Sequence, residues 1–291
     1  MTFSVYPSIL SDSLHQVQEQ LDRLLEVQQE IQTVQVDIID GQFADNLTIT
    51  PIDLLDVNTH DFSIDFHLMV DEPIDYVFEC KQVEHTRAVI AQIERMTSQS
   101  EYIQECLAVG VLPGLSLDLY TPVESIGEDS WDELKVIQVM GNKSGIQGQE
   151  FAGEVVLEKI RTLSEFKKQR ELQYLEIIVD IGVNDRQIHE LVKAGATGGA
   201  PGSYLWKSED LPEAIGKLRV HKERVSDLTD VFCTVECYNF QATSNLLLCV
   251  HKSSFHHPKI IQVLKMWQYL DQQTSILKTL CIKKHLMWLD I

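Results

Sequence analysis

The sequence predicts an α/β fold: a (β/α)8 barrel with a non-barrel segment at its C-terminal end. Short apolar runs of β-type residues alternate with longer amphipathic stretches, and eight such runs fall within the first 220 or so residues. The alternation ends near residue 225, where the composition changes. Strands separated by helices favour a parallel sheet, and eight units of this length fit a closed barrel. An open doubly wound sheet is the structural alternative.

The predicted strands are short and rich in β-branched residues. They are residues 3–10, 33–40, 62–70, 87–93, 114–119, 133–140, 175–183 and 195–203. Helices are predicted between several of them, over residues 14–31, 155–172 and 185–194. In the first helix, Leu14, Val17 and Leu21 recur at helical spacing after candidate N-cap side chains at residues 11–13.

The change near residue 225 predicts two parts, a barrel over residues 1–225 and an extension over residues 226–291. The extension contains five acidic residues and six lysines, so it carries about +1 and the barrel about −21 of the net charge of −20. It also holds four of the six cysteines. Residues 260–280 could form one amphipathic helix, but the strand–helix alternation does not continue.

The charge excludes several classes of partner. An acidic protein repels phosphates, so general binding to nucleic acid or to an anionic membrane is not expected. No basic residue precedes the apolar residues at the N-terminus, and no apolar run reaches transmembrane length. Six cysteines in 291 residues do not suggest a disulfide framework. These observations predict a cytoplasmic protein.

Three polar residues stand where a barrel places its active site. Asp37, His67 and Asp180 lie toward the C-terminal ends of the second, third and seventh predicted strands. Two carboxylates from different strands suit the removal of a proton from one face of a carbon and its return to the other. When that carbon lies next to a carbonyl, loss of the proton gives an enediolate, and a metal ion would stabilise its oxygens as a Lewis acid. His and Asp ligands suit Zn²⁺, Fe²⁺ or Mn²⁺.

Glycine-bearing loops follow the late strands, at residues 145–151 and 198–203. Loops of this kind expose backbone N–H groups and form the usual phosphate site of such barrels. The site needs no lysine or arginine, which agrees with so acidic a chain. The glycines do not match a nucleotide-binding P-loop, because no Lys-Ser or Lys-Thr pair follows them at the required place.

An ordered series of motifs across residues 3–220 resembles the ribulose-phosphate 3-epimerase family. The motifs include PSIL (7–10), VDIIDGQFADNLTITP (36–51), DFHLMV (65–70), GLSLDLYTPVE (114–124), GIQGQEF (145–151) and VDIGV (179–183). The resemblance implies a TIM barrel that interconverts D-ribulose 5-phosphate and D-xylulose 5-phosphate in the pentose phosphate pathway. It implies a small sugar phosphate as the partner and is compatible with a homo-oligomer.

The resemblance also assigns roles to individual residues. It implies that Asp37 and Asp180 are the paired acid and base and that they bind the metal together with His67. The family's remaining histidine ligand falls on Gln35, whose amide oxygen coordinates late transition metals more weakly. His67 is also placed beside the substrate, with Ser8. Matches to the segments that hold the phosphate are Gly145, Gly148, Gly182, Gly202 and Ser203.

Several positions depart from the family pattern. Besides Gln35, Ile181 replaces a glycine that follows the catalytic aspartate, and Leu119 replaces a proline. Ser144, Ile146 and Gln147 replace a proline, an aromatic residue and a glycine, while Ala44 and Asp45 alter the segment before Asn46. Three hypotheses follow: the pentulose-phosphate epimerase with reduced activity, an epimerase for another ketose phosphate, or a sugar-phosphate-binding barrel with impaired catalysis.

Overall fold

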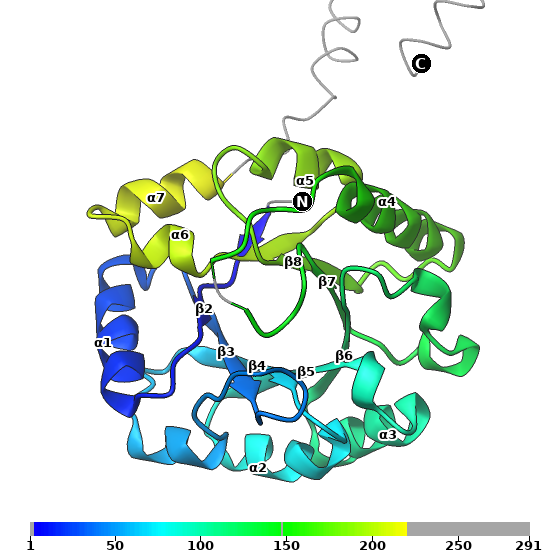
Figure 1. Ribbon diagram of the computed structural model, residues 1–291, viewed down its shortest axis with the longest axis horizontal. Helices are drawn as coiled ribbons and strands as arrows, with labels where there is room; N and C mark the ends of the chain where they lie inside the picture. Colours follow the sequence, from blue (N-terminus) through cyan, green and yellow to red (C-terminus); the bar gives the residue numbers. More distant parts are fainter. Residues whose placement is uncertain (1–2, 147, 220–291) are drawn as a thin grey trace, which may run out of the picture. The chain divides into compact units, whose positions relative to one another are not determined.

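The computed structural model describes residues 3–146 and 148–219, which form a closed parallel barrel (Figure 1). The sheet order is β1-β9-β8-β7-β6-β5-β4-β3-β2, and every neighbouring pair is parallel. Segments β1 and β2 are two halves of the first strand, separated by Tyr6 and Pro7. Because β1 pairs with β9 and β2 pairs with β3, the sheet closes on itself. The predicted barrel is confirmed, and the open sheet is wrong.

All eight predicted strands are present within a few residues of their expected ends. Their bounds are β1 Ser4–Val5, β2 Ser8–Ile9, β3 Thr33–Ile39, β4 Ser63–Met69, β5 Thr86–Gln92, β6 Leu112–Leu117, β7 Val136–Met140, β8 Glu176–Asp180 and β9 Gly198–Ala200. Most of their residues are buried, because helices cover the outer face and other strands face the inner one.

The helices form a ring around the strands (Figure 1). The α-helices are α1 Leu14–Leu24, α2 Val77–Gln82, α3 Gln99–Val109, α4 Glu154–Gln169, α5 Ile188–Ala194, α6 Ser203–Trp206 and α7 Leu211–Leu218. Short 3₁₀ turns lie between them at Leu25–Val27, Ile52–Asp56, Pro73–Tyr76, Ile93–Arg95, Val123–Ser125 and Glu128–Ser130.

Two predicted helices are shorter than expected. The helix expected over residues 14–31 ends at Leu24, and the chain continues as a 3₁₀ turn over Leu25–Val27. The helix expected from residue 185 begins at Ile188. There the side chain of Asn184 accepts a hydrogen bond from the backbone N–H of Arg186 at 2.9 Å, which holds the preceding residues in a turn.

The interior of the barrel has a small apolar cluster at its centre and charged side chains at one end. Side chains on the inner faces of the strands form the cluster: Tyr6, Ala88, Ile90, Val136, Ile178 and Ala200. At the N-terminal end of the strands, Arg87 lies 2.8 Å from Glu176 and contacts the buried carboxylate of Asp65. The opposite end carries the polar residues of the candidate site.

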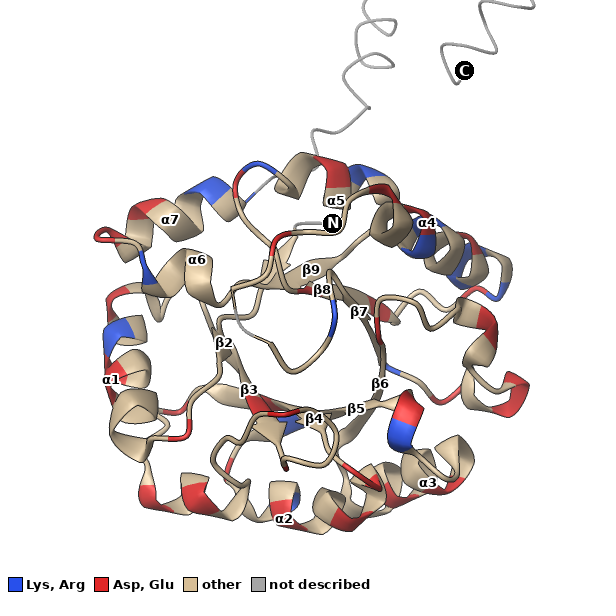
Figure 2. Cartoon of the chain, in the orientation of Figure 1, with Lys and Arg blue, Asp and Glu red and all other residues tan. Residues whose placement is uncertain are grey.

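Acidic side chains are spread over the helical ring, whereas few charges line the centre of the barrel (Figure 2). Among the helices that the structure describes, none is long and apolar enough to cross a membrane. Residues 220–291 lie outside the described part, and so do Gln147 and the helix expected over residues 260–280. The division into residues 1–225 and 226–291 therefore stays a prediction.

Candidate active site

The C-terminal ends of three strands bring Asp37, His67 and Asp180 together. Asp37 and His67 are direct partners in the pairing of β3 with β4, and Asp180 is the last residue of β8. The Nδ1 atom of His67 lies 3.1 Å from Asp37 Oδ1 and 3.3 Å from Asp180 Oδ2. All three side chains are buried. The imidazole therefore stands between two carboxylates that arrive from different sides of the barrel.

Gln35 links the same two carboxylates from a third direction. Its Nε2 atom donates hydrogen bonds of 2.9 Å to Asp37 Oδ1 and of 2.9 Å to Asp180 Oδ2. The side chain is 1% exposed, so these bonds are shielded from water. The amide nitrogen, not the amide oxygen, faces the carboxylates in this arrangement.

Further donors surround the two carboxylates. Asp180 accepts hydrogen bonds from Gln138 Nε2 at 3.1 Å and from the backbone N–H of Ile181 at 2.7 Å. Ser8, predicted to contact the substrate, donates from its Oγ to Asp37 Oδ2 at 2.6 Å. Burial, followed by the charge of Asp37, raises the pKa of Asp180 above its ordinary value.

The pKa of His67 reflects two opposing effects. Burial lowers it, but the hydrogen bonds to Asp180 and Asp37 and the negative charges of these residues outweigh burial and raise it to about 9. A ring that carries both protons also needs an acceptor at Nε2. The amide of Gln92 lies within hydrogen-bond distance there: its nitrogen is 3.1 Å away, and its oxygen has no partner within the described part.

The sequence prediction missed Gln92 and Gln138, both fully buried on the inner faces of strands. Gln92 ends β5 and shares a face with Ile90, while Gln138 shares a face with Met140 on β7. Strand alternation could have identified them, because a glutamine on the apolar inner face near a strand's C-terminal end lies close to the site. In contrast, Asp40 supports the turn after β3 by accepting from the backbone N–H groups of Gln42 and Phe43.

The segment after Asp180 is held very close to β7. A Cβ atom added to Gly141 would lie 2.0 Å from the carbonyl oxygen of Ile181, so only glycine allows this approach. Ile181 itself has φ of 70°, a left-handed conformation that is rare for a β-branched residue. The predicted departure from glycine at this position therefore coincides with backbone strain beside the candidate acid.

The cavity above the carboxylates contains most of the predicted substrate residues. It is lined by Ser8, Asp37, Asp180, Gly145, Gly148, Gly182, Gly202 and Ser203, with Met69, Met140, Ile146 and Ile181 among its walls. Its volume is about 50 Å³, room for one or two water molecules.

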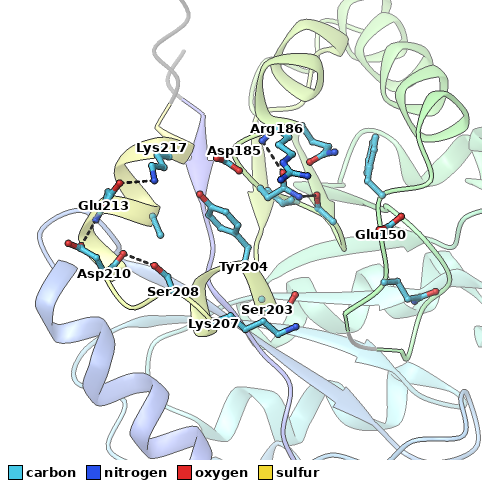
Figure 3. A pocket seen from close by; sticks show the side chains of 18 residues that line it. Glu150, Asp185, Arg186, Ser203, Tyr204, Lys207, Ser208, Asp210, Glu213 and Lys217 are labelled. Carbon is cyan, nitrogen blue, oxygen red and sulfur yellow. Dashed lines mark hydrogen bonds and ion pairs between the residues drawn. The ribbon is translucent and has the colours of Figure 1, made fainter.

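A larger cavity of about 670 Å³ adjoins this one and shares Gln149, Gly182, Gly202 and Ser203 with it (Figure 3). Its walls carry charges of both signs, including Arg186 and Lys207 from the segments around α5 and α6. The candidate catalytic carboxylates are not among its lining residues. It therefore lies beside the glycine-bearing loops rather than beside Asp37 and Asp180.

A sequence model described as the Ribulose-phosphate 3 epimerase family matches residues 4–206. The chain belongs to this family. It is 31% identical over 217 residues to the ribulose-phosphate 3-epimerase of Helicobacter pylori, covering 74% of this chain and 96% of the relative. The enzyme of Bacillus subtilis is 30% identical over 190 residues, covering 65% and 86%. The cytoplasmic isoform of Oryza sativa is 29% identical over 218 residues, covering 74% and 92%. The protein is thus an enzyme of the epimerase class.

Solved structures agree with the barrel assignment. The chain resembles 3-hexulose-6-phosphate synthase at 13% identity with a TM-score of 0.50, covering 75% of this chain and 98% of that one. It resembles a mutant tryptophan synthase α-subunit from Pyrococcus furiosus at 14% identity with a TM-score of 0.51, with the same coverage. At these identities the likeness concerns the fold alone.

The donor atoms present fit a divalent metal ion. Asp37, His67 and Asp180 each offer one ligand atom, and these atoms lie within 4.8 Å of one another. Two carboxylate oxygens and one imidazole nitrogen are a donor set that Zn²⁺, Fe²⁺ and Mn²⁺ accept. A fourth protein ligand would require the amide of Gln35 to turn its oxygen toward the carboxylates.

Proposed function

We propose that this epimerase is metal-dependent and interconverts D-ribulose 5-phosphate and D-xylulose 5-phosphate. The observation that carries the proposal is the meeting of Asp37 and Asp180 with His67 between them, from three different strands. A 3-epimerisation needs two acid/base groups, one on each face of the substrate carbon. Two buried carboxylates that are both reached by one imidazole supply this arrangement.

In the proposed reaction one carboxylate breaks the C–H bond at C3 by accepting its proton. The electron pair of that bond moves toward the C2 carbonyl and forms an enediolate. The other carboxyl group then gives a proton to the opposite face of C3, which inverts the centre. The raised pKa of Asp180 suits it to hold that proton, with Asp37 as the base, and the roles exchange in the reverse direction.

The metal would be held by Asp37, His67 and Asp180, with Gln35 as a weak additional ligand if its amide turns. When bound, it would supply Lewis-acid stabilisation to the enediolate oxygens. Ser8, which donates to Asp37, would orient that carboxylate and contact the substrate. The Nδ1 atom of His67, which lies between the two carboxylates, would be the ligand atom of the imidazole.

The phosphate group would bind to backbone N–H groups of the loops after β7, β8 and β9. Gly145, Gly148, Gly182, Gly202 and Ser203 line the cavity at this side. Four of these positions carry no side chain beyond hydrogen, so the backbone can approach the phosphate closely. Such a site supplies hydrogen bonds without lysine or arginine in a strongly acidic protein.

The test is conversion of ribulose 5-phosphate to xylulose 5-phosphate by the full-length protein, assayed without metal and with Zn²⁺, Fe²⁺ or Mn²⁺. We expect turnover with at least one metal. The variants Asp37→Asn and Asp180→Asn should each lower kcat by roughly 10²–10⁴-fold. Asp12→Asn, at an exposed position, is the control and should match the wild type. Folded protein without turnover under any metal condition would contradict the proposal.

A second candidate is an epimerase for another ketose phosphate. It is favoured by the isoleucine side chains of Ile146 and Ile181 in the cavity wall and by the large cavity beyond the phosphate loops. A panel of pentulose and hexulose phosphates, compared by kcat/KM, distinguishes the two. Impaired catalysis, suggested by Gln35, predicts sugar-phosphate binding with no turnover across the same panel.

A further inference from the structure

A chain of buried polar groups reaches His67 from the side opposite the carboxylates. Gln92, 0% exposed, has its Nε2 atom 3.1 Å from His67 Nε2 and 2.9 Å from Ser144 Oγ. Ser144 in turn donates to Asp118 Oδ1 from its backbone N–H at 2.9 Å and from its Oγ at 2.8 Å. The chain therefore connects the residue just after β6 with the candidate metal ligand.

The two nitrogens of His67 face different partners. Nδ1 faces Asp37 and Asp180, so it is the atom that a metal between the carboxylates would take. A histidine that binds a metal through one nitrogen carries its proton on the other, and that N–H needs an acceptor. At Nε2 the group within hydrogen-bond distance is the amide of Gln92. Its nitrogen cannot accept, but its oxygen can.

The amide can exchange these atoms by a half-turn about its last torsion, because NH₂ and O are nearly equal in size. Ser144 tolerates either orientation, since a hydroxyl both accepts and donates. In the first orientation Ser144 Oγ accepts from Gln92 and donates to Asp118. In the second orientation the hydroxyl of Ser144 would donate to Gln92 Oε1, while the backbone N–H of Ser144 still donates to Asp118.

We propose that Gln92 is a positioning residue for metal binding: it turns its amide oxygen toward His67 Nε2–H and so directs Nδ1 to the metal. Ser144 anchors the amide in both orientations. The inference rests on the metal site of the proposed function and extends it to two residues that touch neither substrate nor metal. It explains why buried polar side chains at positions 92 and 144 occur together.

The test is a Co²⁺ titration of the metal-free full-length protein, followed by visible absorption. Gln92→Leu removes the acceptor and should weaken Co²⁺ binding by roughly 10–100-fold. Gln92→Glu keeps an acceptor at both positions and should bind Co²⁺ at least as tightly as the wild type. Ser144→Ala, a smaller change, should weaken binding by about three- to tenfold. Its matched control is Ser116→Ala, because Ser116 is equally small and buried but has no hydrogen-bond partner in the described part.

A spectroscopic measurement separates positioning from a general loss of structure. In the zinc-loaded wild type, ¹⁵N NMR of the imidazoles should show His67 protonated at Nε2 alone, and Gln92→Leu should lose this single form. Equal Co²⁺ affinity in the wild type and Gln92→Leu would overturn the inference and leave the metal site intact. Weaker binding by Gln92→Glu would also overturn it. A wild type that binds no metal would overturn both the inference and the metal dependence.

Discussion

The amide nitrogen of Gln35 lies 2.9 Å from the Oδ2 atom of Asp180, although the two residues are 145 positions apart in the chain. The same nitrogen is 2.9 Å from Asp37 Oδ1, so one side chain joins both candidate acid/base groups. These hydrogen bonds restrain both carboxylates from the same side. They also turn the amide oxygen of Gln35, the side chain's only potential ligand atom, away from both carboxylates.

Replacing Gln35 with histidine should strengthen metal binding. Imidazole is a better ligand than an amide oxygen for late transition metals, and the replacement removes the hydrogen bonds that compete for the carboxylates. We expect Gln35→His to bind Zn²⁺ at least tenfold more tightly, measured by competition with a chromophoric chelator. Gln35→Leu, which also removes the hydrogen bonds but adds no ligand, is the control. Equal increases in Zn²⁺ affinity in both variants would mean that loss of the hydrogen bonds, and not the added imidazole, strengthens metal binding.

The raised pKa of His67 predicts a specific dependence of stability on pH in the metal-free protein. A histidine whose folded pKa is about 9 stabilises the fold fully below its ordinary value near 6.5, and this contribution is lost as the pH rises through 9. The loss should be on the order of 3 kcal/mol. Urea unfolding at pH 6 and pH 9.5 measures it.

The comparison must be made against His67→Gln, because Lys159 titrates in the same range. Burial lowers the pKa of Lys159 to about 8, and this group has the opposite effect on stability as the pH rises. Subtracting the unfolding free energies of the two proteins at each pH removes the contribution of Lys159. If the difference in unfolding free energy between wild type and His67→Gln is the same at both pH values, His67 is not charged in the folded protein.

Arg87 should be essential for stability at the N-terminal end of the barrel. Its guanidinium group pairs with Asp65, which is 1% exposed, and with Glu176, and its charge counteracts the burial that raises the pKa of Asp65. Arg87→Met leaves Asp65 buried without a cation and should lower the free energy of unfolding by about 3–5 kcal/mol. Arg161→Met, which removes an exposed pair with Glu154, should leave it almost unchanged.

Ile181→Gly should relieve strain next to Asp180. The left-handed backbone of Ile181 costs about 1–2 kcal/mol in a non-glycine residue, whereas glycine adopts it freely but has more entropy in the unfolded chain. We expect thermal unfolding to show no loss of stability or a gain of up to about 1 kcal/mol. The cavity would also widen, so KM for the sugar phosphate should fall. A loss above about 2 kcal/mol would show that packing of the isoleucine side chain outweighs the strain.

The sequence by itself determined the barrel. Alternation of apolar strands and amphipathic helices depends on local residue type, and eight such units can bury their strands in few ways. It also placed Asp37, His67 and Asp180 at strand ends, because the side-chain period of a strand is two residues. Helix ends at Leu24 and Ile188 were misjudged, since turns and caps there depend on single contacts such as that of Asn184.

The tertiary structure alone decided which atoms meet inside the barrel. Closure of the sheet brings β3 and β8 together across the mouth, and only then does the amide of Gln35 face two carboxylates. The same closure carries Gln92 and Ser144, 52 positions apart, to the far side of His67. Whether a hydrogen bond forms, and in which direction, depends on differences of a few tenths of an ångström in the distance between residues that are remote in the chain. The spacing of residues along the sequence carries no such information.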